Sequence, residues 1–340
     1  MASPSSTLTI AVDAMGGDHA PAHVVEGALL AAREGAGRFA VTLVGREDAV
    51  RAELRRLAAP EGLLGLVHAS EVVEMHDAPN AALKAKRDSS MAVGIALHRD
   101  GKADAFVSAG NTGAVLSAST LILGRVRGVG RPTIGALLPT ASRPCFLVDA
   151  GANVDCKARH LYEFAVMGSI YVASMLGVER PRVGLLNVGE EEGKGNEVSQ
   201  ETYALLKASA LNFAGNVEGR DILRGAVDVV VCDGFVGNIL LKFGESIPAF
   251  FKAKFTALAA GSLTAKLAGL AARKSLRAVM KELDYQEHGG VPLLGVNGVS
   301  IIGHGGSPPK AIKNMILRAE ETARHRINQR IEDALHHAAA

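Results

Sequence analysis

The sequence lacks tryptophan and contains only four tyrosines and three cysteines among its 340 residues. Few aromatic rings are present on which nucleic acid bases could stack, and a formal net charge of +2 gives no general attraction to nucleic acid. The cysteines, Cys145, Cys156 and Cys232, are odd in number and far apart, which argues against a disulfide framework and a zinc site. We expect no nucleic acid partner and a reducing compartment.

Signals of export and of several catalytic classes are also missing. No uninterrupted apolar run reaches the roughly 18 residues of a membrane span, and residues 1–6 lack the basic and apolar regions of a signal peptide. The HExxH, GxSxG and GxGxxG motifs are absent. Residues 189–194 (GEEEGK) come near to a P-loop, but the spacing is one residue short and Gly195 stands where a hydroxyl would hold magnesium. We predict a cytoplasmic protein with residues 1–6 disordered, no metal site and no cofactor.

Glycine is abundant, with 38 residues, and much of it follows apolar strands. Residues 9–21 (TIAVDAMGGDHAP) predict a strand that reaches Asp13, a turn at Gly16 and Gly17, and a helix start near Asp18. A strand, a glycine turn and a helix N-terminus together present backbone N–H groups to an anion. The alternative for any one such turn is plain chain reversal with a capping aspartate.

The same pattern recurs along the chain, because a strand over 103–107 enters the turn 108–113 (SAGNTG) and a helix follows through 123. Strands that alternate with helices predict an α/β fold, with three layers (α/β/α) and a largely parallel sheet, and we treat 1–340 as a single domain. Ligands bind such sheets at the carboxyl ends of the strands, so we expect the turns to gather at one rim. Further strands are predicted over 8–12, 39–44, 63–69, 133–138, 145–148, 182–186, 227–231 and 299–302, and further helices over 24–32, 47–58, 80–98, 160–176, 197–211 and 308–335.

The turns are rich in small residues and uncharged donors, which suits a phosphate or a developing oxyanion. Asp13, Asp149 and Asp233 follow strands, where an aspartate is a metal ligand, a base or, more commonly, a turn or cap residue. His304 either serves a phosphate or is an exposed loop residue, and Lys194 either reaches an anion or is solvated beside glutamates. The donors are the backbone amides of Gly16, Gly17, Gly110, Gly113, Gly305 and Gly306 and the side chains of Asn111, Thr112, Asn153, Asn238 and Ser307.

Residues 247–281 differ from the rest because they contain seven basic residues and no acidic one. Leucines recur there at helical spacing, and Gly261 with Ser262 predicts a break, so we predict a basic, amphipathic helical hairpin inserted over 247–286. Such a face attracts an anionic bilayer or an acidic protein, and the alternative is an ordinary surface helix. The predicted contact residues are Lys252, Lys254, Leu263, Lys266, Leu267, Leu270, Arg273, Lys274 and Arg277.

Six stretches together resemble one known family. They are VDAMGGDHAP (12–21), SAGNTGA (108–114), DAGAN (149–153), NVGEEEGKGNE (187–197), CDGFVGNILLK (232–242) and GHGGS (303–307). In their order and their spread over almost the whole chain they are similar to the bacterial phosphate acyltransferases of phospholipid synthesis (acyl-ACP:phosphate acyltransferase). Gly306 departs from the family pattern, in which a serine is frequent, whereas Ser307 remains.

The resemblance implies transfer of a fatty acyl group from acyl carrier protein to inorganic phosphate. The product, an acyl phosphate, would supply a membrane glycerol-3-phosphate acyltransferase. It further implies a homodimer, peripheral contact with the inner face of the cell membrane, and a fold similar to the isocitrate and isopropylmalate dehydrogenases and the phosphotransacetylases. The basic hairpin is where we expect the membrane or carrier contact.

On this basis we expect phosphate to attack the thioester directly, held by the turns at Gly16/Gly17 and Asn111/Thr112, with charge neutralised by Lys194 and a proton or orientation supplied by His304. Two alternatives remain open, a metal-dependent dehydrogenase on a similar fold and a non-catalytic membrane adaptor. The predicted catalytic residues are His304, Lys194, Asn111 and Asp13, and the predicted binding residues are Gly16, Gly17, Asp18, Ser108, Gly110, Thr112, Asn153, Asn196, Asp233, Asn238 and Ser307.

Overall fold

The computed structural model describes residues 7–260 and 289–337, and its strands form one mixed sheet. The strands are β1 (Leu8–Asp13), β2 (Phe39–Gly45), β3 (Gly65–His68), β4 (Ala105–Ser108), β5 (Thr133–Leu138), β6 (Cys145–Val148), β7 (Arg182–Leu186), β8 (Asn212–Val217), β9 (Val229–Val231), β10 (Val291–Leu294) and β11 (Ser300–Ile302). In the described residues their order is β3-β2-β1-β4-β11-β10-β5-β6-β9-β7-β8. Seven of the ten neighbouring pairs are parallel, which confirms the predicted, largely parallel sheet.

Helices cover both faces of the half that begins with β1. They are α1 (Ala22–Gly35), α2 (Glu47–Arg56), α3 (Pro79–Ala85), α4 (Ser90–Arg99), α5 (Thr112–Ile122) and α11 (Pro309–Arg324). Successive strand residues point to opposite faces. Ile10 and Val12 accordingly lie in a core cluster with residues of α1 and α11, whereas Ala11 lies in a cluster with residues of α4 and α5.

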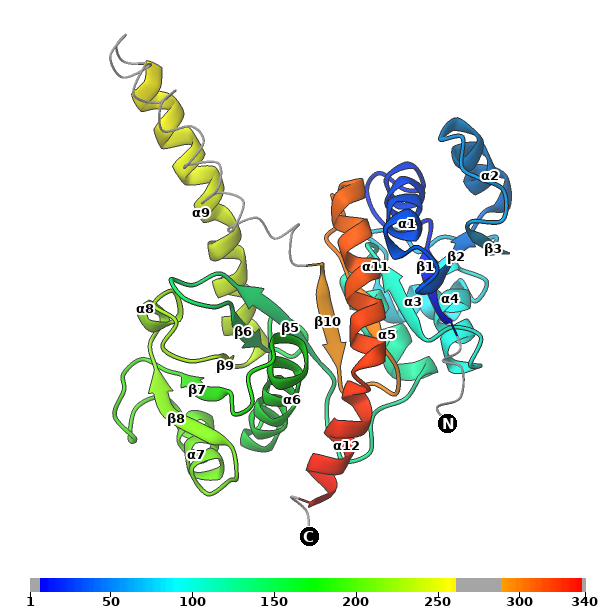
Figure 1. The fold of residues 1–340 in the computed structure, drawn as a ribbon. Helices are drawn as coiled ribbons and strands as arrows, with labels where there is room; N and C mark the ends of the chain where they lie inside the picture. The colour runs from blue at the N-terminus through cyan, green and yellow to red at the C-terminus, as the bar shows by residue number, and fades with distance from the viewer. Residues whose placement is uncertain (1–6, 261–288, 338–340) are drawn as a thin grey trace.

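The other half of the sheet is covered in the same way (Figure 1). Its helices are α6 (Ala158–Leu176), α7 (Glu197–Lys207), α8 (Gly219–Ile222), α9 (Gly234–Ala260) and α12 (Ile327–His337). Phe146 and Val148 of β6 pack with residues of α6 and α12, while Leu147 lies in the cluster that residues of α9 contact. The predicted three-layer arrangement is therefore present in both halves.

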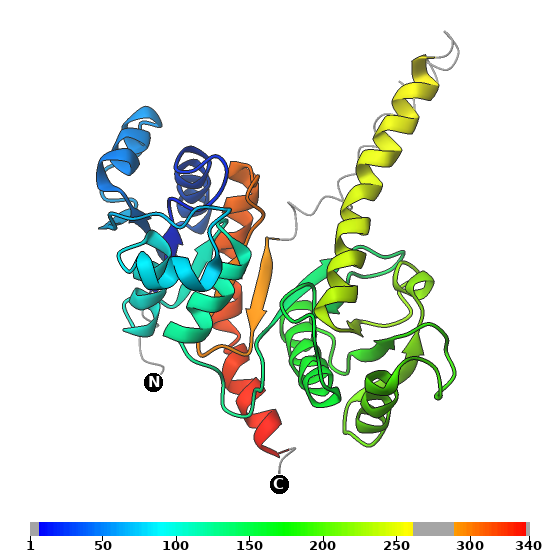
Figure 2. The ribbon, with the colours of Figure 1, turned by 180° about the vertical axis from the view of Figure 1, so that it is seen from behind.

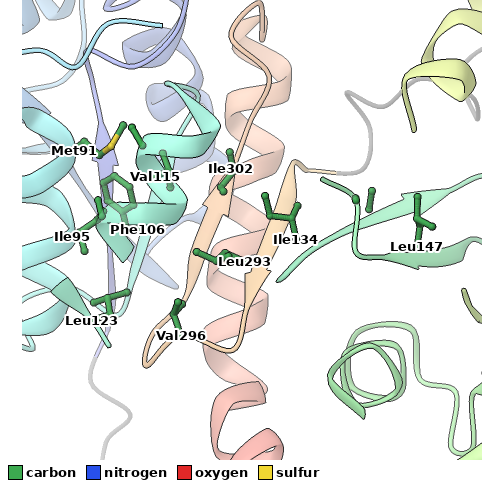
Figure 3. Close-up of a cluster of buried hydrophobic side chains, with 14 of the residues drawn as sticks. Met91, Ile95, Phe106, Val115, Leu123, Ile134, Leu147, Leu293, Val296 and Ile302 are labelled. Atoms are coloured by element: carbon green, nitrogen blue, oxygen red, sulfur yellow. The ribbon is translucent and has the colours of Figure 1, made fainter. Parts of the chain in front are cut away.

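Strand β5 joins the two halves. Its residues Thr133 and Ile134 pair with β10, and residues 135–138 pair with β6. Figure 3 shows the buried side chains of one cluster running from Phe106 past Leu293 and Ile134 to Leu147. Because the pairs β11·β10, β10·β5 and β5·β6 are all antiparallel, β6, β7, β8 and β9 run opposite to β1, β2, β3, β4 and β11.

Three predicted helices differ from the structure, and two of its strands, β8 and β10, were not predicted. The helix predicted over 80–98 is broken into α3 and α4, since the Ser89 Oγ accepts the Ala92 N–H and starts a new helix. The helix predicted over 197–211 ends at Lys207, and β8 follows it. The closing helix divides into α11 and α12 around Arg326, which has a φ of +49°.

Helix α9 begins at Gly234, thirteen residues before the predicted hairpin, and projects from the body of the molecule (Figures 1 and 2). Lys252 and Lys254 are exposed on it. The remaining hairpin contacts, namely Leu263, Lys266, Leu267, Leu270, Arg273, Lys274 and Arg277, lie outside the described residues, as do residues 1–6. Among the helices that the structure describes, none combines the length and the apolar character that a membrane crossing needs.

Candidate functional site

Strand β1 ends at Asp13, whose carboxylate lies beneath the first glycine turn and is 2% exposed. The Ser108 Oγ, at the end of β4, donates a 2.7 Å hydrogen bond to Asp13 Oδ2, and the Met15 N–H donates a 3.2 Å bond to Oδ1. Burial raises the pKa of Asp13, and hydrogen bonds, including those from Ser90 and Ser108, act in the opposite direction. Asp13 thus joins the ends of two strands from beneath the surface.

Gly16 brings the turns after β1 and β4 into direct contact. A Cβ at Gly16 would lie 2.6 Å from Asp13 Oδ2, 2.8 Å from Ser108 Oγ and 2.9 Å from the backbone nitrogen of Gly110. The Gly110 N–H in turn donates a 3.0 Å hydrogen bond to Ser108 Oγ. A side chain at position 16 would therefore force the two turns apart.

The turn after β11 joins this group. The Asp18 N–H donates a 2.8 Å hydrogen bond to the Gly305 carbonyl, and His23 Nδ1 lies 3.2 Å from the Ser307 carbonyl. The Gly306 N–H donates to His304 Nδ1 at 3.1 Å, so this nitrogen is the acceptor and a neutral His304 carries its proton on Nε2. Since β1, β4 and β11 are neighbours in the sheet, their three turns meet at one end of it.

Asn111 starts helix α5 and uses its whole side chain to do so. Its Oδ1 accepts the Ala114 N–H at 3.1 Å, and its Nδ2 donates to the carbonyls of Met75 and Asp77 at 2.9 and 3.0 Å. Both amide hydrogens are consequently occupied by the loop that precedes α3. Asn111 therefore shapes this turn and has no side-chain donor left for a ligand.

Free donors do remain around these turns. Thr112 and Gly113 are the first residues of α5, whose N–H groups have no acceptor within the helix. Among the described residues no hydrogen bond forms from the N–H of Gly17, Thr112 or Gly113. We call the turns at 16–18, 110–113 and 304–306 the glycine cradle. Asp18, Thr112 and His304 are exposed at its surface, so the cradle opens to solvent and presents positive dipole ends to an anion.

A second group of predicted residues surrounds the turn after β6. Asp149 is fully buried and accepts hydrogen bonds from the N–H groups of residues 151–153, which makes it a turn residue; burial raises its pKa. Asn153 Nδ2 donates to Asp149 Oδ2 and to the Pro132 carbonyl, so its amide hydrogens are also occupied.

Helix α9 packs its first turn against that turn. The Gly234 N–H donates to the Asn153 carbonyl at 2.7 Å, and a Cβ at Gly237 would lie 1.8 Å from the Asp149 carbonyl oxygen. Asp233 caps the helix, because its Oδ1 accepts the Val236 N–H at 2.8 Å. Asn238 lies on the helix against Gly151 and is exposed.

Lys194 lies in the loop 187–197 that follows β7. Its side chain is 50% exposed, its Nζ is 3.7 Å from Glu191 Oε1, and its carbonyl accepts a bond from Asn187 Nδ2 at 3.1 Å. Asn196 caps α7, since its Oδ1 accepts the N–H and the Oγ of Ser199. The loop is thus held by amide side chains and leaves the Lys194 ammonium at the surface.

The expectation that all turns share one rim is wrong. Lys194, Asn153, Asp233 and Asn238 follow strands that run opposite to β1, β4 and β11, because β5 reverses the direction of the second half. The two groups are nevertheless connected through Asn153. It lines a pocket of about 390 Å³ together with Asn80 of α3, next to the loop that Asn111 holds.

Sequence reasoning missed several residues that build these sites. Ser90 hydrogen-bonds Asp13, and Asn187 with Asn216 forms an amide pair at 3.1 Å that supports the Lys194 loop. Residues 74–77 supply the Met75 and Asp77 carbonyls that hold Asn111 at the start of α5. No sequence signal indicated these contacts, because the partners are distant in sequence and the acceptors are backbone atoms.

In the part of the chain that the structure describes, no group of three or more His, Cys, Asp or Glu side chains is placed to hold a metal ion.

Comparison with known proteins gives one consistent result. Residues 8–330 match the family described as "Fatty acid synthesis protein". The chain is 49% identical to the phosphate acyltransferase of Pelotomaculum thermopropionicum, over 96% of this chain and 95% of that protein. It is 48% identical to the phosphate acyltransferase of Geobacter sulfurreducens, over 96% of this chain and 94% of that protein.

Solved structures show the same fold at low identity. The EutD phosphotransacetylase from Staphylococcus aureus has a TM-score of 0.61 at 16% identity, covering 93% of this chain and 94% of its own. A phosphotransacetylase from Streptococcus pyogenes has a TM-score of 0.60 at 16% identity, with 94% of each chain covered. The predicted similarity to the phosphotransacetylase fold is confirmed.

Proposed function

The chain belongs to the fatty acid synthesis protein family and is a phosphate acyltransferase, and from this premise we propose that it transfers a fatty acyl group from acyl carrier protein to inorganic phosphate. The acyl phosphate formed would then supply phospholipid synthesis. The family assignment supports the reaction type, and the resemblance of the six sequence stretches supports the carrier protein as donor.

The observation that carries the proposal is the glycine cradle. Backbone N–H groups of Gly17, Thr112 and Gly113 lack protein partners among the described residues. Thr112 and Gly113 begin helix α5, and Gly17 lies in the turn after β1. Such donors bind an anion through charge-assisted hydrogen bonds and the helix dipole. Inorganic phosphate is already anionic near neutral pH, so it needs no protein base to become a nucleophile.

In the proposed reaction a phosphate oxygen attacks the thioester carbonyl carbon. The new C–O bond forms, the carbonyl carries an oxyanion, and collapse of this intermediate breaks the C–S bond and releases the carrier thiolate. Backbone donors lower the barrier by binding the oxyanion more tightly than the neutral carbonyl. Two substrates held side by side also gain from proximity.

The structure refines the roles that we propose for individual residues. His304 offers Nε2 to phosphate or to the leaving thiolate, because its Nδ1 is bonded to the Gly306 N–H. Lys194 neutralises charge from the second group of residues, on the side where Asn196 and Asn238 lie. Asp13 and Asn111 act as positioning residues, since the first is buried and the second uses its whole amide locally.

The direct test is the product. We expect acyl phosphate from acyl carrier protein thioester and phosphate, and much less from the coenzyme A thioester. Acyl phosphate formed from the coenzyme A thioester and not from the acyl carrier protein thioester would reject the carrier protein as the donor. Magnesium-dependent reduction of NAD without acyl phosphate would instead support the alternative dehydrogenase.

Helix α9 is where we propose contacts beyond the active site. Phe235, Ile239, Phe243 and Phe250 are 56–67% exposed and recur at helical spacing, as expected of a face that a second copy of the chain covers. Sedimentation of the wild type and of Phe243→Glu tests this homodimer, and an unchanged mass would reject the assignment of this face.

The basic tip of α9 supports peripheral membrane contact. Lys252 and Lys254 are exposed there, and each cation near an anionic bilayer favours binding by roughly fivefold. We expect the Lys252→Gln/Lys254→Gln variant to bind anionic vesicles roughly twenty-fold more weakly, while Lys102→Gln/Lys207→Gln, on other surfaces, binds as the wild type does. Vesicle binding without phosphate-dependent turnover would favour the adaptor alternative.

A further inference from the structure

A pocket of about 440 Å³ lies between the end of β7 and the amino ends of α7 and α9. We call it the α7–α9 pocket. Its walls include Leu161, Leu185, Leu186 and Val198, and its volume falls in the range of small-molecule sites. The reaction outlined above leaves it without a role.

Asn187, Asn196 and Asp233, which line this pocket, form hydrogen bonds within the protein, whereas the Asp155 side chain and Asn196 Nδ2, which have no such bond among the described residues, belong to exposed residues. Asn187 uses both amide hydrogens on the Lys194 carbonyl and Asn216 Oδ1, and its Oδ1 accepts the Val188 N–H. Asn196 and Asp233 cap helices with their Oδ1 atoms. An apolar occupant therefore leaves few buried polar groups unpaired, whereas a polar occupant finds few free partners.

The thiols in the walls behave in the same way. Cys156 Sγ donates to the Asn153 carbonyl, and Cys232 Sγ donates to the Asp149 carbonyl. Burial raises the pKa of Cys156 to about 12, so it remains a neutral thiol. Neither sulfur places a charge in the pocket.

The mouth of the pocket is apolar and open to solvent. Val188 is 81% exposed, Val154 is 61% exposed and Val236 is 41% exposed, and all three line the pocket. Exposed apolar side chains around a cavity are typical of a ligand entrance.

We propose that the α7–α9 pocket binds the alkyl chain of the acyl donor. This assignment rests on the proposed acyl transfer and adds to it the place of the chain. Asn196, which lines the pocket, follows Lys194 by two residues, so the pocket lies beside the loop that carries this cation, and the methylenes extend between α7 and α9. Each buried methylene favours binding by roughly fourfold.

The experiment fills the pocket and measures chain-length preference. In Val198→Phe we expect the ratio of kcat/KM for hexadecanoyl over octanoyl carrier protein to fall roughly tenfold or more, because room for about two methylenes is lost. Val236→Trp, at the exposed mouth, provides a second variant that is easier to fold. Leu64→Phe is the matched control, since Leu64 lines a pocket of similar volume, about 440 Å³, at the end of α2.

Turnover and binding are measured separately, so that failure of the two proposals can be told apart. Binding of hexadecanoate and octanoate to the free protein is followed by calorimetry. We expect the wild type to bind the longer chain more tightly, and we expect Val198→Phe and Val236→Trp to lose this preference. Equal losses for both chains in turnover and binding, or no preference in the wild type, would overturn the pocket assignment. A preserved binding preference without acyl phosphate would instead reject the proposed reaction.

Discussion

The Ser108 hydroxyl donates a 2.7 Å hydrogen bond to the buried carboxylate of Asp13, 95 residues earlier in the chain. The bond joins the ends of β1 and β4, which are neighbours in the sheet. Because Ser108 Oγ also accepts the Gly110 N–H at 3.0 Å, one hydroxyl fixes both turns. The position of the free N–H groups in the cradle therefore depends on a pair of side chains that is buried beneath the turns.

This pair leads to a pH-dependent prediction for Asp13→Asn. Burial raises the pKa of Asp13 above its ordinary value of 3.8, so the folded protein holds this proton more tightly than the unfolded chain does. Stability from this group is present at low pH and is lost as pH rises through the raised pKa. The variant loses the charge, and we expect its free energy of unfolding to improve relative to the wild type as pH rises.

Urea denaturation from about pH 4 to about pH 8 measures this difference, on top of a constant cost of about 1–3 kcal/mol for the altered hydrogen bonds. Asp104→Asn is the control, because Asp104 is exposed and accepts the Thr9 N–H at the other end of the same strands. A difference between Asp13→Asn and the wild type that stays constant with pH would contradict the prediction.

Gly16→Ala tests the contact between the first two turns. The added Cβ would meet Asp13 Oδ2 at 2.6 Å and the Gly110 nitrogen at 2.9 Å, and neither can move without moving a turn. We expect a stability loss of about 1–3 kcal/mol and a fall in kcat of about a hundredfold from displaced donors. Gly219→Ala, where nothing lies within 4 Å of the new Cβ, should keep both values.

The local parts of this fold follow from the sequence. Apolar residues that end in Asp13, Gly16 and Gly17 predict β1 and its turn, and the structure has both. Strands β5, β6 and β7 also have the predicted bounds. All three are marked by apolar runs, because both faces of the sheet are covered by helices, and β6 and β7 are followed by Asp149 and Asn187.

The features of the fold and the site that could not be predicted from the sequence depend on partners that are distant along the chain. Strand β8 contains Asn212, Gly215 and Asn216, a poor strand composition, and it exists because it pairs with β7 at the edge of the sheet. The reversal at β5 separates the turns into two groups, and no local pattern indicates it. Asn111 was predicted as a catalytic residue, and no local pattern indicates that carbonyls 34 and 36 residues away accept its amide hydrogens.

Asn111→Asp isolates the positioning role of that amide. Aspartate keeps the oxygen that caps α5 but cannot donate to the Met75 and Asp77 carbonyls. We expect a stability loss of about 1–3 kcal/mol and faster hydrogen exchange in residues 74–77. Asn196→Asp is the matched control, because Asn196 caps α7 through Oδ1 and shows no Nδ2 bond among the described residues. Equal stability losses in the two variants would contradict the proposed role.

His304 gives the sharpest test of the cradle, because its two ring nitrogens have different tasks. Nδ1 accepts the Gly306 N–H, so Nε2 is the atom that we propose for phosphate or the thiolate. Asparagine places a polar atom near the Nδ1 position, and glutamine places one near Nε2. We expect His304→Gln to keep more kcat/KM for phosphate than His304→Asn, and His304→Ala to lose about 10²–10⁴-fold if the ring transfers the proton. If His304→Asn is the more active of the two, the turn needs the ring only for shape, and unchanged acyl phosphate formation by His304→Ala would remove the residue from the mechanism.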